Sequence, residues 1–116
     1  MKKCVLMLLV GAMALVVGAQ DPGVVAKSVY KQKLANDRVR VFEIVFQPGQ
    51  AIPMHAHPDH VVYVVTGGTL EIKEKGKPVV KLAGKPGDTF FLPAQSHSAK
   101  NIGKTVFKAV VVEIRK

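Results

Sequence analysis

Short runs of β-branched and aromatic residues, each stopped by glycine, proline or asparagine, recur along this chain of 116 residues. In the run at 38–46, valines occupy one parity while Phe42, Ile44 and Phe46 occupy the other, so both faces of an extended strand should be at least half-buried. Similar runs lie at 60–66, 69–74, 78–82, 89–92, 97–101 and 105–114. No window shows a sustained apolar period of a helix. The pattern predicts an antiparallel all-β sandwich or barrel of roughly eight strands.

Length and cysteine content exclude several classes of protein. The chain has the length of one domain, and its apolar fraction of 48% argues against wholesale disorder. A single cysteine, Cys4, excludes a disulfide framework and a cysteine-based zinc ribbon, because both need more than one thiol. A two-domain enzyme is excluded as well.

The N-terminus has the features of a secretory leader. Two lysines precede an uncharged apolar run at 4–17, and Val17 and Ala19 place small residues at positions −3 and −1 of a cleavage site after Ala19. We therefore expect residues 1–19 to be a signal peptide and the mature protein to be periplasmic or secreted. The alternative is an uncleaved N-terminal membrane anchor, although the run is shorter than the roughly 20 residues of a membrane span.

The rest of the chain is expected to form a short tail at 20–27 and a barrel domain at 28–116. Two of the 17 basic residues and none of the 8 acidic residues lie in the leader, so the remainder keeps a formal charge of +7. The lysines are dispersed rather than clustered with stacking aromatics, so no nucleic-acid partner is expected. No membrane contact is expected after cleavage. A homodimer is one way for so short a β domain to protect its strand edges.

The four histidines all lie between residues 55 and 97. His55 and His57 share one face of an extended segment, because side chains alternate with period two, and both rings can face one ion. His60 is at odd spacing from this pair, and a turn at Pro58-Asp59 would bring it to the same side. His97 comes from a distant strand. The pattern predicts a metal site inside the barrel formed by His55, His57, His60 and His97.

At these residues the chain resembles the cupin superfamily. The first cupin motif begins with glycine, five residues and His-x-His, which Gly49 and the pair His55 and His57 reproduce. The same motif ends with six residues and a glycine, here Gly67. In the position where cupins place a glutamate ligand, separated from that glycine by six residues, this chain has His60. The gap after His57 is also shorter than in the family.

The second cupin motif is reproduced from Gly87 through Pro93 to His97 and Asn101, with Gln95 where glycine is usual and one residue fewer before the histidine. The resemblance covers about residues 28–116. It implies a double-stranded β-helix, or jelly-roll, barrel with one internal metal site. It also implies that His55, His57 and His97 are ligands, and it implies this of His60 by position alone.

An all-imidazole site favours one divalent transition metal ion, Zn, Cu, Fe, Ni or Mn, over Mg or Ca, which prefer oxygen ligands. Without the glutamate the ion keeps its full charge and should be a stronger Lewis acid toward an anion. Each histidine must be neutral to bind, and its reference pKa is about 6.5, so the site should empty in mild acid.

Few other groups could act as acid or base. The acidic candidates are Asp59, Asp88, Glu43, Glu71, Glu74 and Glu113. Glu43 has the parity of the valines in its run and is either semi-buried or an outward edge residue. Tyr63 has the opposite parity to His60 and is expected between the sheets or at a dimer face.

The sequence therefore predicts an exported, metal-binding cupin-domain protein that acts on or binds a small ligand, with anionic ligands favoured. Whether it is an enzyme is left open by the scarcity of carboxylates near the histidines. The alternatives are a binding module without turnover, and a metal-free structural or interaction barrel.

Overall fold

The structure, a computed structural model, describes residues 20–116, so the predicted leader at 1–19 lies outside the described residues. This part of the chain begins with one short helix, α2 (Pro22–Val25), and continues as nine strands. The strands are β1 (Tyr30–Ala35), β2 (Val39–Phe46), β3 (Ala51–His57), β4 (His60–Thr66), β5 (Gly68–Glu74), β6 (Val80–Gly84), β7 (Thr89–Leu92), β8 (Gln95–Asn101) and β9 (Phe107–Ile114). None of the helices in the described range is long and apolar enough to cross a membrane.

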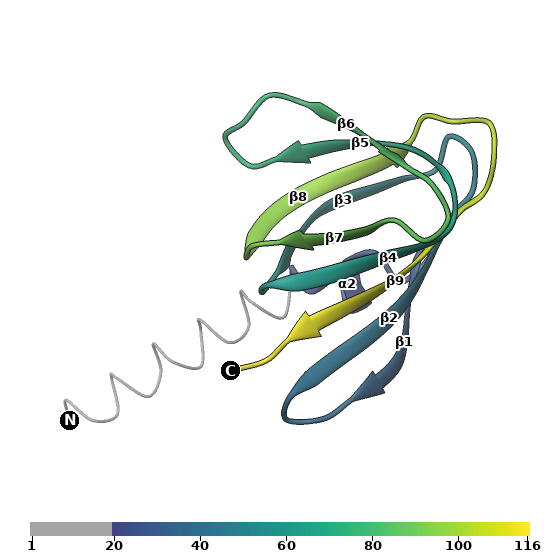
Figure 1. Cartoon of the computed structure of the whole chain (residues 1–116). Helices are drawn as coiled ribbons and strands as arrows, with labels where there is room; N and C mark the ends of the chain where they lie inside the picture. Colours follow the sequence, from purple (N-terminus) through teal and green to yellow (C-terminus); the bar gives the residue numbers. More distant parts are fainter. Residues whose placement is uncertain (1–19) are drawn as a thin grey trace.

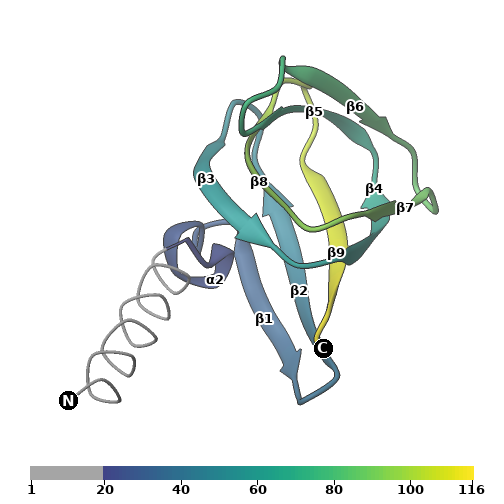
Figure 2. The same ribbon diagram turned by 90° about the vertical axis from the view of Figure 1, so that its left-hand side faces the viewer.

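The strands form two antiparallel sheets that face each other (Figure 1). One sheet has the order β1-β2-β9-β4-β7, and the other has the order β3-β8-β5-β6. In the view turned by 90°, the two sheets curl around a shared interior, which makes the sandwich barrel-like (Figure 2). The prediction of an antiparallel all-β sandwich or barrel is confirmed.

Strand alternation decides which side chains enter this interior. In β2, Phe42, Ile44 and Phe46 are buried, while the valines of the opposite parity are half-buried on the outer side. In β9 the inward positions begin with Phe107, which is fully buried, and end with Glu113. Burying one large apolar side chain of this kind stabilises the fold by about 1.5–3 kcal/mol. The phenylalanines of β2 and β9 therefore hold the five-stranded sheet against its partner.

Two elements were not expected from the sequence. The helical turn α2 begins with a proline at its first position, and Ala26 just after it is buried. Strand β1 is polar, and of its residues only Tyr30 is buried. A polar sequence suits β1 because it is an edge strand in contact with solvent. This polarity is also why apolar alternation does not reveal it.

Two local irregularities position the histidines. The register between β3 and β8 shifts between Ile52 and His55, where Pro53 has no N–H to give to the ladder. After this shift His55 lies directly opposite His97. Residues 58–59 then carry the chain from the four-stranded to the five-stranded sheet, and the histidines on both sides of the connection are buried. The turn expected at Pro58-Asp59 is thus confirmed.

Asn101, the last residue of the second motif, is fully buried at the end of β8. Its Nδ2 donates to the carbonyl oxygens of Phe46 at 3.1 Å and Thr105 at 2.8 Å. Its Oδ1 accepts a hydrogen bond from the Gly103 N–H at 2.9 Å. Asn101 therefore ties the end of β2 to the loop between β8 and β9.

We predict that Asn101→Ala lowers the free energy of unfolding by roughly 2–4 kcal/mol, because it leaves buried backbone groups without partners. The matched control is Asn36→Ala, which also removes an amide side chain bonded to the backbone, but at the exposed surface, where Asn36 Oδ1 accepts from the N–H groups of Arg38 and Val39. Its cost should stay below about 1 kcal/mol because water can replace those bonds. Urea unfolding measures both, and equal losses would contradict a special role for Asn101.

Candidate metal centre

Four imidazole rings gather between the two sheets. His55 and His57 come from β3, His60 from the beginning of β4 and His97 from β8. The ring centroids are 4.8 Å apart for His55 and His57, 4.7 Å for His55 and His97, and 5.1 Å for His57 and His97. The His60 ring stacks on His57 at 4.4 Å and lies 6.3 Å from His97. All four residues are at most 5% exposed.

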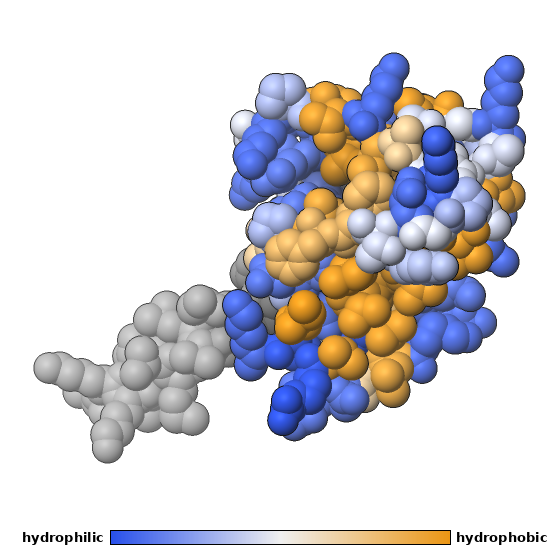
Figure 3. All heavy atoms as spheres, viewed as in Figure 1, coloured by the Kyte–Doolittle hydropathy of each residue, from blue (hydrophilic) through white to orange (hydrophobic). Residues whose placement is uncertain are grey.

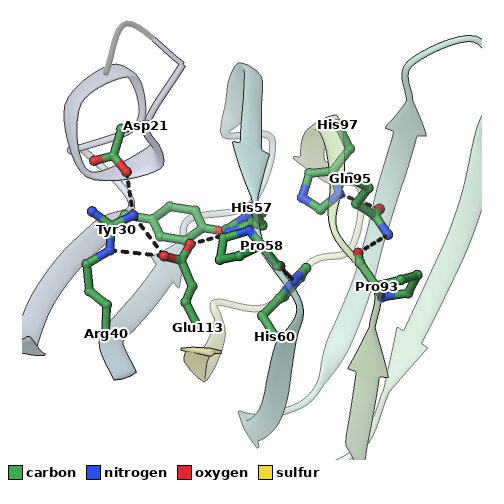
Figure 4. Close-up of polar contacts among 10 residues, drawn as sticks. All are labelled: Asp21, Tyr30, Arg40, His57, Pro58, His60, Pro93, Gln95, His97 and Glu113. Carbon is green, nitrogen blue, oxygen red and sulfur yellow. Dashed lines mark hydrogen bonds and ion pairs between the residues drawn. The ribbon is translucent and has the colours of Figure 1, made fainter. Parts of the chain in front are cut away.

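Two of the rings are oriented by proline carbonyl groups two residues earlier in the chain. His55 Nδ1 donates to the Pro53 carbonyl oxygen at 2.8 Å. His60 Nδ1 donates to the Pro58 carbonyl oxygen, also at 2.8 Å (Figure 4). A carbonyl oxygen can only accept, so the ring proton must be on Nδ1 and the lone pair on Nε2. The hydrogen bonds therefore leave both Nε2 atoms available to a ligand.

His97 is oriented in the same way through one intermediate side chain. Its Nδ1 donates to Gln95 Oε1 at 2.8 Å, and Gln95 Nε2 donates to the Pro93 carbonyl oxygen at 3.2 Å. The second bond fixes which end of the amide faces the ring. Gln95 replaces the glycine that is usual in the second motif, so this departure provides a partner for His97.

The nitrogen set fits a metal ion. Among the described residues, His55 Nε2 is the one buried side-chain nitrogen or oxygen without a hydrogen-bond partner. One ligand atom from each of His55, His57 and His97 lies within 4.8 Å of the other two. Around zinc, tetrahedral imidazole nitrogens are about 3.4 Å apart, so each pair of nitrogens would need to approach by at most about 1.4 Å. These three clustered histidines could hold a metal ion.

His57 differs from the others because both of its nitrogens are engaged. Nδ1 donates to Glu113 Oε2 at 2.6 Å, and Nε2 accepts a hydrogen bond from the Tyr30 hydroxyl at 3.1 Å. A carboxylate behind a histidine ligand fixes its tautomer and strengthens its basicity. An ion binding to Nε2 of His57 would have to displace the Tyr30 hydroxyl from that nitrogen.

Glu113 is itself held by Arg40, its cross-strand neighbour on β2. Glu113 Oε1 accepts from Arg40 Nε at 3.0 Å and from Nη2 at 2.8 Å, and Arg40 also pairs with Asp21 (Figure 4). Burial alone would raise the pKa of Glu113, but the hydrogen bonds from His57 and Arg40 outweigh burial and hold the pKa below its usual value. Glu113 is therefore ionised at neutral pH.

The remaining histidines stay neutral well below neutral pH. Burial, and to a smaller extent the neighbouring imidazoles, lower the pKa of His55 to about 4 and that of His97 to about 3. The pKa of His60 is also lowered, first by burial and then by His57. Protons therefore compete for these rings only at lower pH than their reference value suggests.

Two hollows adjoin the histidines. A small cavity of about 40 Å³ is lined by Tyr30, His60 and His97 and otherwise by apolar side chains. A larger cleft of about 630 Å³ borders His57 and Glu113. Its charged lining residues are Asp21, Arg40, Asp59, Glu113, Arg115 and Lys116. The small cavity is thus apolar apart from the site, whereas the cleft is lined by acidic and basic residues in equal number.

The sequence did not reveal the partners of the histidines. Glu43, the carboxylate that β2 parity singles out, lies on the outer side, whereas Glu113 is 2% exposed. The sequence does hold one indication that Glu113 points inward. It lies on the same side of β9 as the apolar Phe107 and on the opposite side from Lys108. Tyr63 lies on the outer side and is 49% exposed, so it does not pack between the sheets.

A family profile described as "Cupin domain" matches residues 42–113. A cupin-domain protein of Bordetella pertussis Tohama I is 30% identical with a TM-score of 0.70, over 76% of this chain and 93% of that chain. An uncharacterised protein with a double-stranded β-helix domain from Klebsiella pneumoniae is 29% identical with a TM-score of 0.61, over 74% and 75% of the two chains.

A more distant similarity supports the same fold. A cupin-family protein from Methanocaldococcus jannaschii is 18% identical with a TM-score of 0.61, over 75% of this chain and 79% of that chain. No curated protein matches this chain. The family profile covers more than half of the sequence, and it includes all four histidines and Glu113. This chain therefore belongs to the cupin domain family.

Proposed function

We propose that this cupin domain binds one divalent transition metal ion through His55, His57 and His97 and uses it to hold a small anionic ligand. The observation that carries the proposal is the buried Nε2 of His55, which has no partner and is surrounded by two further imidazoles. An unsatisfied buried acceptor costs about 1–3 kcal/mol, and a bound cation would remove that cost. In line with the leader, the proposed location is the periplasm or the exterior of the cell.

Three imidazole nitrogens favour a transition metal ion of intermediate softness. Three neutral imidazoles suit Zn, Cu, Fe, Ni or Mn better than Mg or Ca, which need oxygen ligands. When bound, such an ion supplies Lewis-acid attraction for an anion. His60 lies beside the three proposed metal ligands. We propose that its ring faces the space for the bound anion and does not bind the metal. The prediction that it is a fourth ligand can be tested separately.

The cavity beside the histidines supports a very small ligand. Its volume of about 40 Å³ has room for about three water molecules. Its polar lining is limited to Tyr30, His60 and His97. Burial raises the pKa of Tyr30, so this hydroxyl stays protonated and can donate a hydrogen bond to an anion. No carboxylate lines the cavity, so the geometry supports binding better than turnover.

We predict that the purified, metal-stripped full chain takes up one Zn(II) or Co(II) per molecule. His55→Ala and His97→Ala should each weaken metal binding at least about tenfold, because each removes an imidazole ligand. Isothermal titration against a competing chelator measures the affinity. His60→Ala is the internal comparison and should change it less than tenfold.

A chain that stays metal-free at neutral pH would overturn the proposal and leave the metal-free structural barrel as the better interpretation. If His60→Ala weakened binding as much as His97→Ala, His60 would be a fourth ligand. Thermal unfolding in the presence of chelator shows whether each variant is folded.

Glu113→Gln should weaken metal binding roughly 10- to 100-fold, because the neutral amide no longer strengthens the basicity of His57. The same titration measures this effect. Glu43→Gln is the matched control, since it makes the same change on the outer side of β2, and it should leave the affinity unaltered. An unchanged affinity in Glu113→Gln would show that the hydrogen bond to His57 does not influence the metal site.

The stability of the metal-free protein should fall as the pH is lowered from 6.5 toward 4. The lowered pKa values of His55, His60 and His97 mean that the unfolded chain takes up protons in this range while the folded chain does not. Each such histidine contributes a slope of at most about 1.4 kcal/mol per pH unit. Urea unfolding at several pH values measures the slope, and His97→Ala should make it shallower. A flat profile would contradict the predicted burial of neutral rings.

A further inference from the structure

The small cavity beside the histidines is polar at one end only. Of the thirteen described residues that line it, Tyr30, His60 and His97 carry polar groups, and the other ten are apolar. The His60 and His97 rings lie 6.3 Å apart, so the polar groups gather at the histidines. A ligand that fills this cavity therefore needs a polar end for the histidines and an apolar remainder for the other walls.

The apolar part of the cavity reaches the edges of the two sheets. β6 and β7 are edge strands of different sheets. Val80 has the same parity in β6 as Leu82, which lines the cavity, and yet Val80 is 58% exposed. Leu92 of β7 also lines the cavity and is half-buried. The inner side of both edge strands is therefore partly open to solvent.

β6 and β7 lie on the side of the molecule that faces the viewer in Figure 1. Figure 3, drawn in the same view, shows hydrophobic side chains at the surface over and between these two strands. Because edge strands of different sheets are joined by side-chain contacts and not by a ladder, an apolar group can enter here without breaking backbone hydrogen bonds.

The cavity accepts little charge. Its described lining contains no lysine, arginine, aspartate or glutamate, so the positive charge for an anion would come from the bound metal ion alone. A dianion would bring a second negative charge among apolar walls, where an uncompensated charge is costly. The cavity therefore favours an anion with a single charge.

Tyr30 offers a second contact for such an anion. Its hydroxyl donates to His57 Nε2 at 3.1 Å, and its ring packs edge-on against Phe42 with the centroids 5.2 Å apart. An ion on His57 Nε2 would take the lone pair that now accepts from Tyr30, and the packed ring would keep the released hydroxyl close by as a donor. A carboxylate has two oxygens, so one can bind the ion while the other accepts from Tyr30.

We propose that the ligand of this cavity is a short-chain aliphatic monocarboxylate. Its carboxylate lies at the ion and Tyr30, and its alkyl tail lies against the apolar walls toward Leu82 and Leu92. The volume of about 40 Å³, or about three water molecules, suits a tail of about three carbon atoms. This inference rests on the proposed function, because the ion supplies the positive charge.

The test titrates carboxylates of increasing length into the purified full chain loaded with Co(II), whose visible absorption reports the ligands of the ion. From acetate through propionate to butyrate, each added methylene should tighten binding about fourfold, because burying one CH₂ group contributes about 0.8 kcal/mol. Hexanoate should gain less per methylene, because its tail would reach solvent. Sulfate, a dianion, should bind at least about tenfold more weakly than butyrate. Azide, a monoanion without a tail, is the reference ligand.

Two variants separate the two ends of the ligand. Tyr30→Phe should weaken acetate and butyrate alike, at least about fivefold, and keep the gain per methylene. Leu82→Gln should keep acetate binding and abolish the gain per methylene, because the tail would then meet an amide. Leu34→Gln is the matched control: Leu34 is 51% exposed on β1, so the same change there should leave the whole series unaltered.

Equal affinities for acetate and butyrate, or tighter binding of sulfate than of butyrate, would overturn the inference. So would a gain per methylene that Leu82→Gln leaves intact, or an acetate affinity that Tyr30→Phe leaves unchanged. If Co(II) and azide still bind in those cases, the proposed function stands. A chain that takes up no Co(II) would instead overturn the proposed function and this inference with it. Thermal unfolding shows whether each variant is folded, and the wild-type series decides the question without them.

Discussion

Inside the sandwich, the Glu113 carboxylate accepts two hydrogen bonds from Arg40 and one from His57. A carboxylate buried to this degree would be very costly without such partners. Its charge in turn keeps the proton on Nδ1 of His57 and turns Nε2 toward the other imidazoles. The His60 ring stacks on His57, and the Tyr30 hydroxyl bonds to it, so their positions follow from the same hydrogen bond.

Proline carbonyl groups complete the arrangement. Pro53 and Pro58 each accept from a histidine two residues later, and Pro93 accepts from Gln95, which in turn accepts from His97. Proline has no N–H and occurs at bulges and strand ends, where a carbonyl oxygen is not used by the sheet ladder. The backbone irregularities that bring the rings together therefore also provide the acceptors that set their tautomers.

Much of the fold follows from alternation in the sequence. Phe42, Ile44 and Phe46 identify the inner side of β2, and turn residues mark most strand ends, so an all-β sandwich is predictable. Strand β1 is not, because an edge strand in water gains from polar residues and loses the apolar period that would reveal it.

The histidines of the site are predictable in the same way, since His-x-His spacing and the Pro58-Asp59 turn are local properties. Their partners depend on contacts between distant strands. Glu113 reaches His57 across 56 residues of sequence, and Arg40 reaches Glu113 across 73. Only the parity of β9 hints at the first contact, and nothing in the sequence indicates that Tyr30 touches the site. Gln95 is visible in advance only as a departure from the cupin motif.

This chain lacks the glutamate ligand of cupins, and the contacts of Glu113 change the charge that a bound ion would present to an anion. If no carboxylate contacted the site, a bound ion would keep its full positive charge toward an anion. Glu113 places a negative charge behind His57, one ring away from the ion, which would reduce that attraction. Arg40 counters part of this effect, because it is paired with the same carboxylate, although it lies farther from the histidines than Glu113 does. Asp21 then offsets part of the Arg40 charge at the outer end of the chain of contacts. Negative and positive charges alternate from Glu113 through Arg40 to Asp21, and their fields largely cancel at a distance. The imidazole site should therefore remain more electrophilic than a site with a directly bound glutamate.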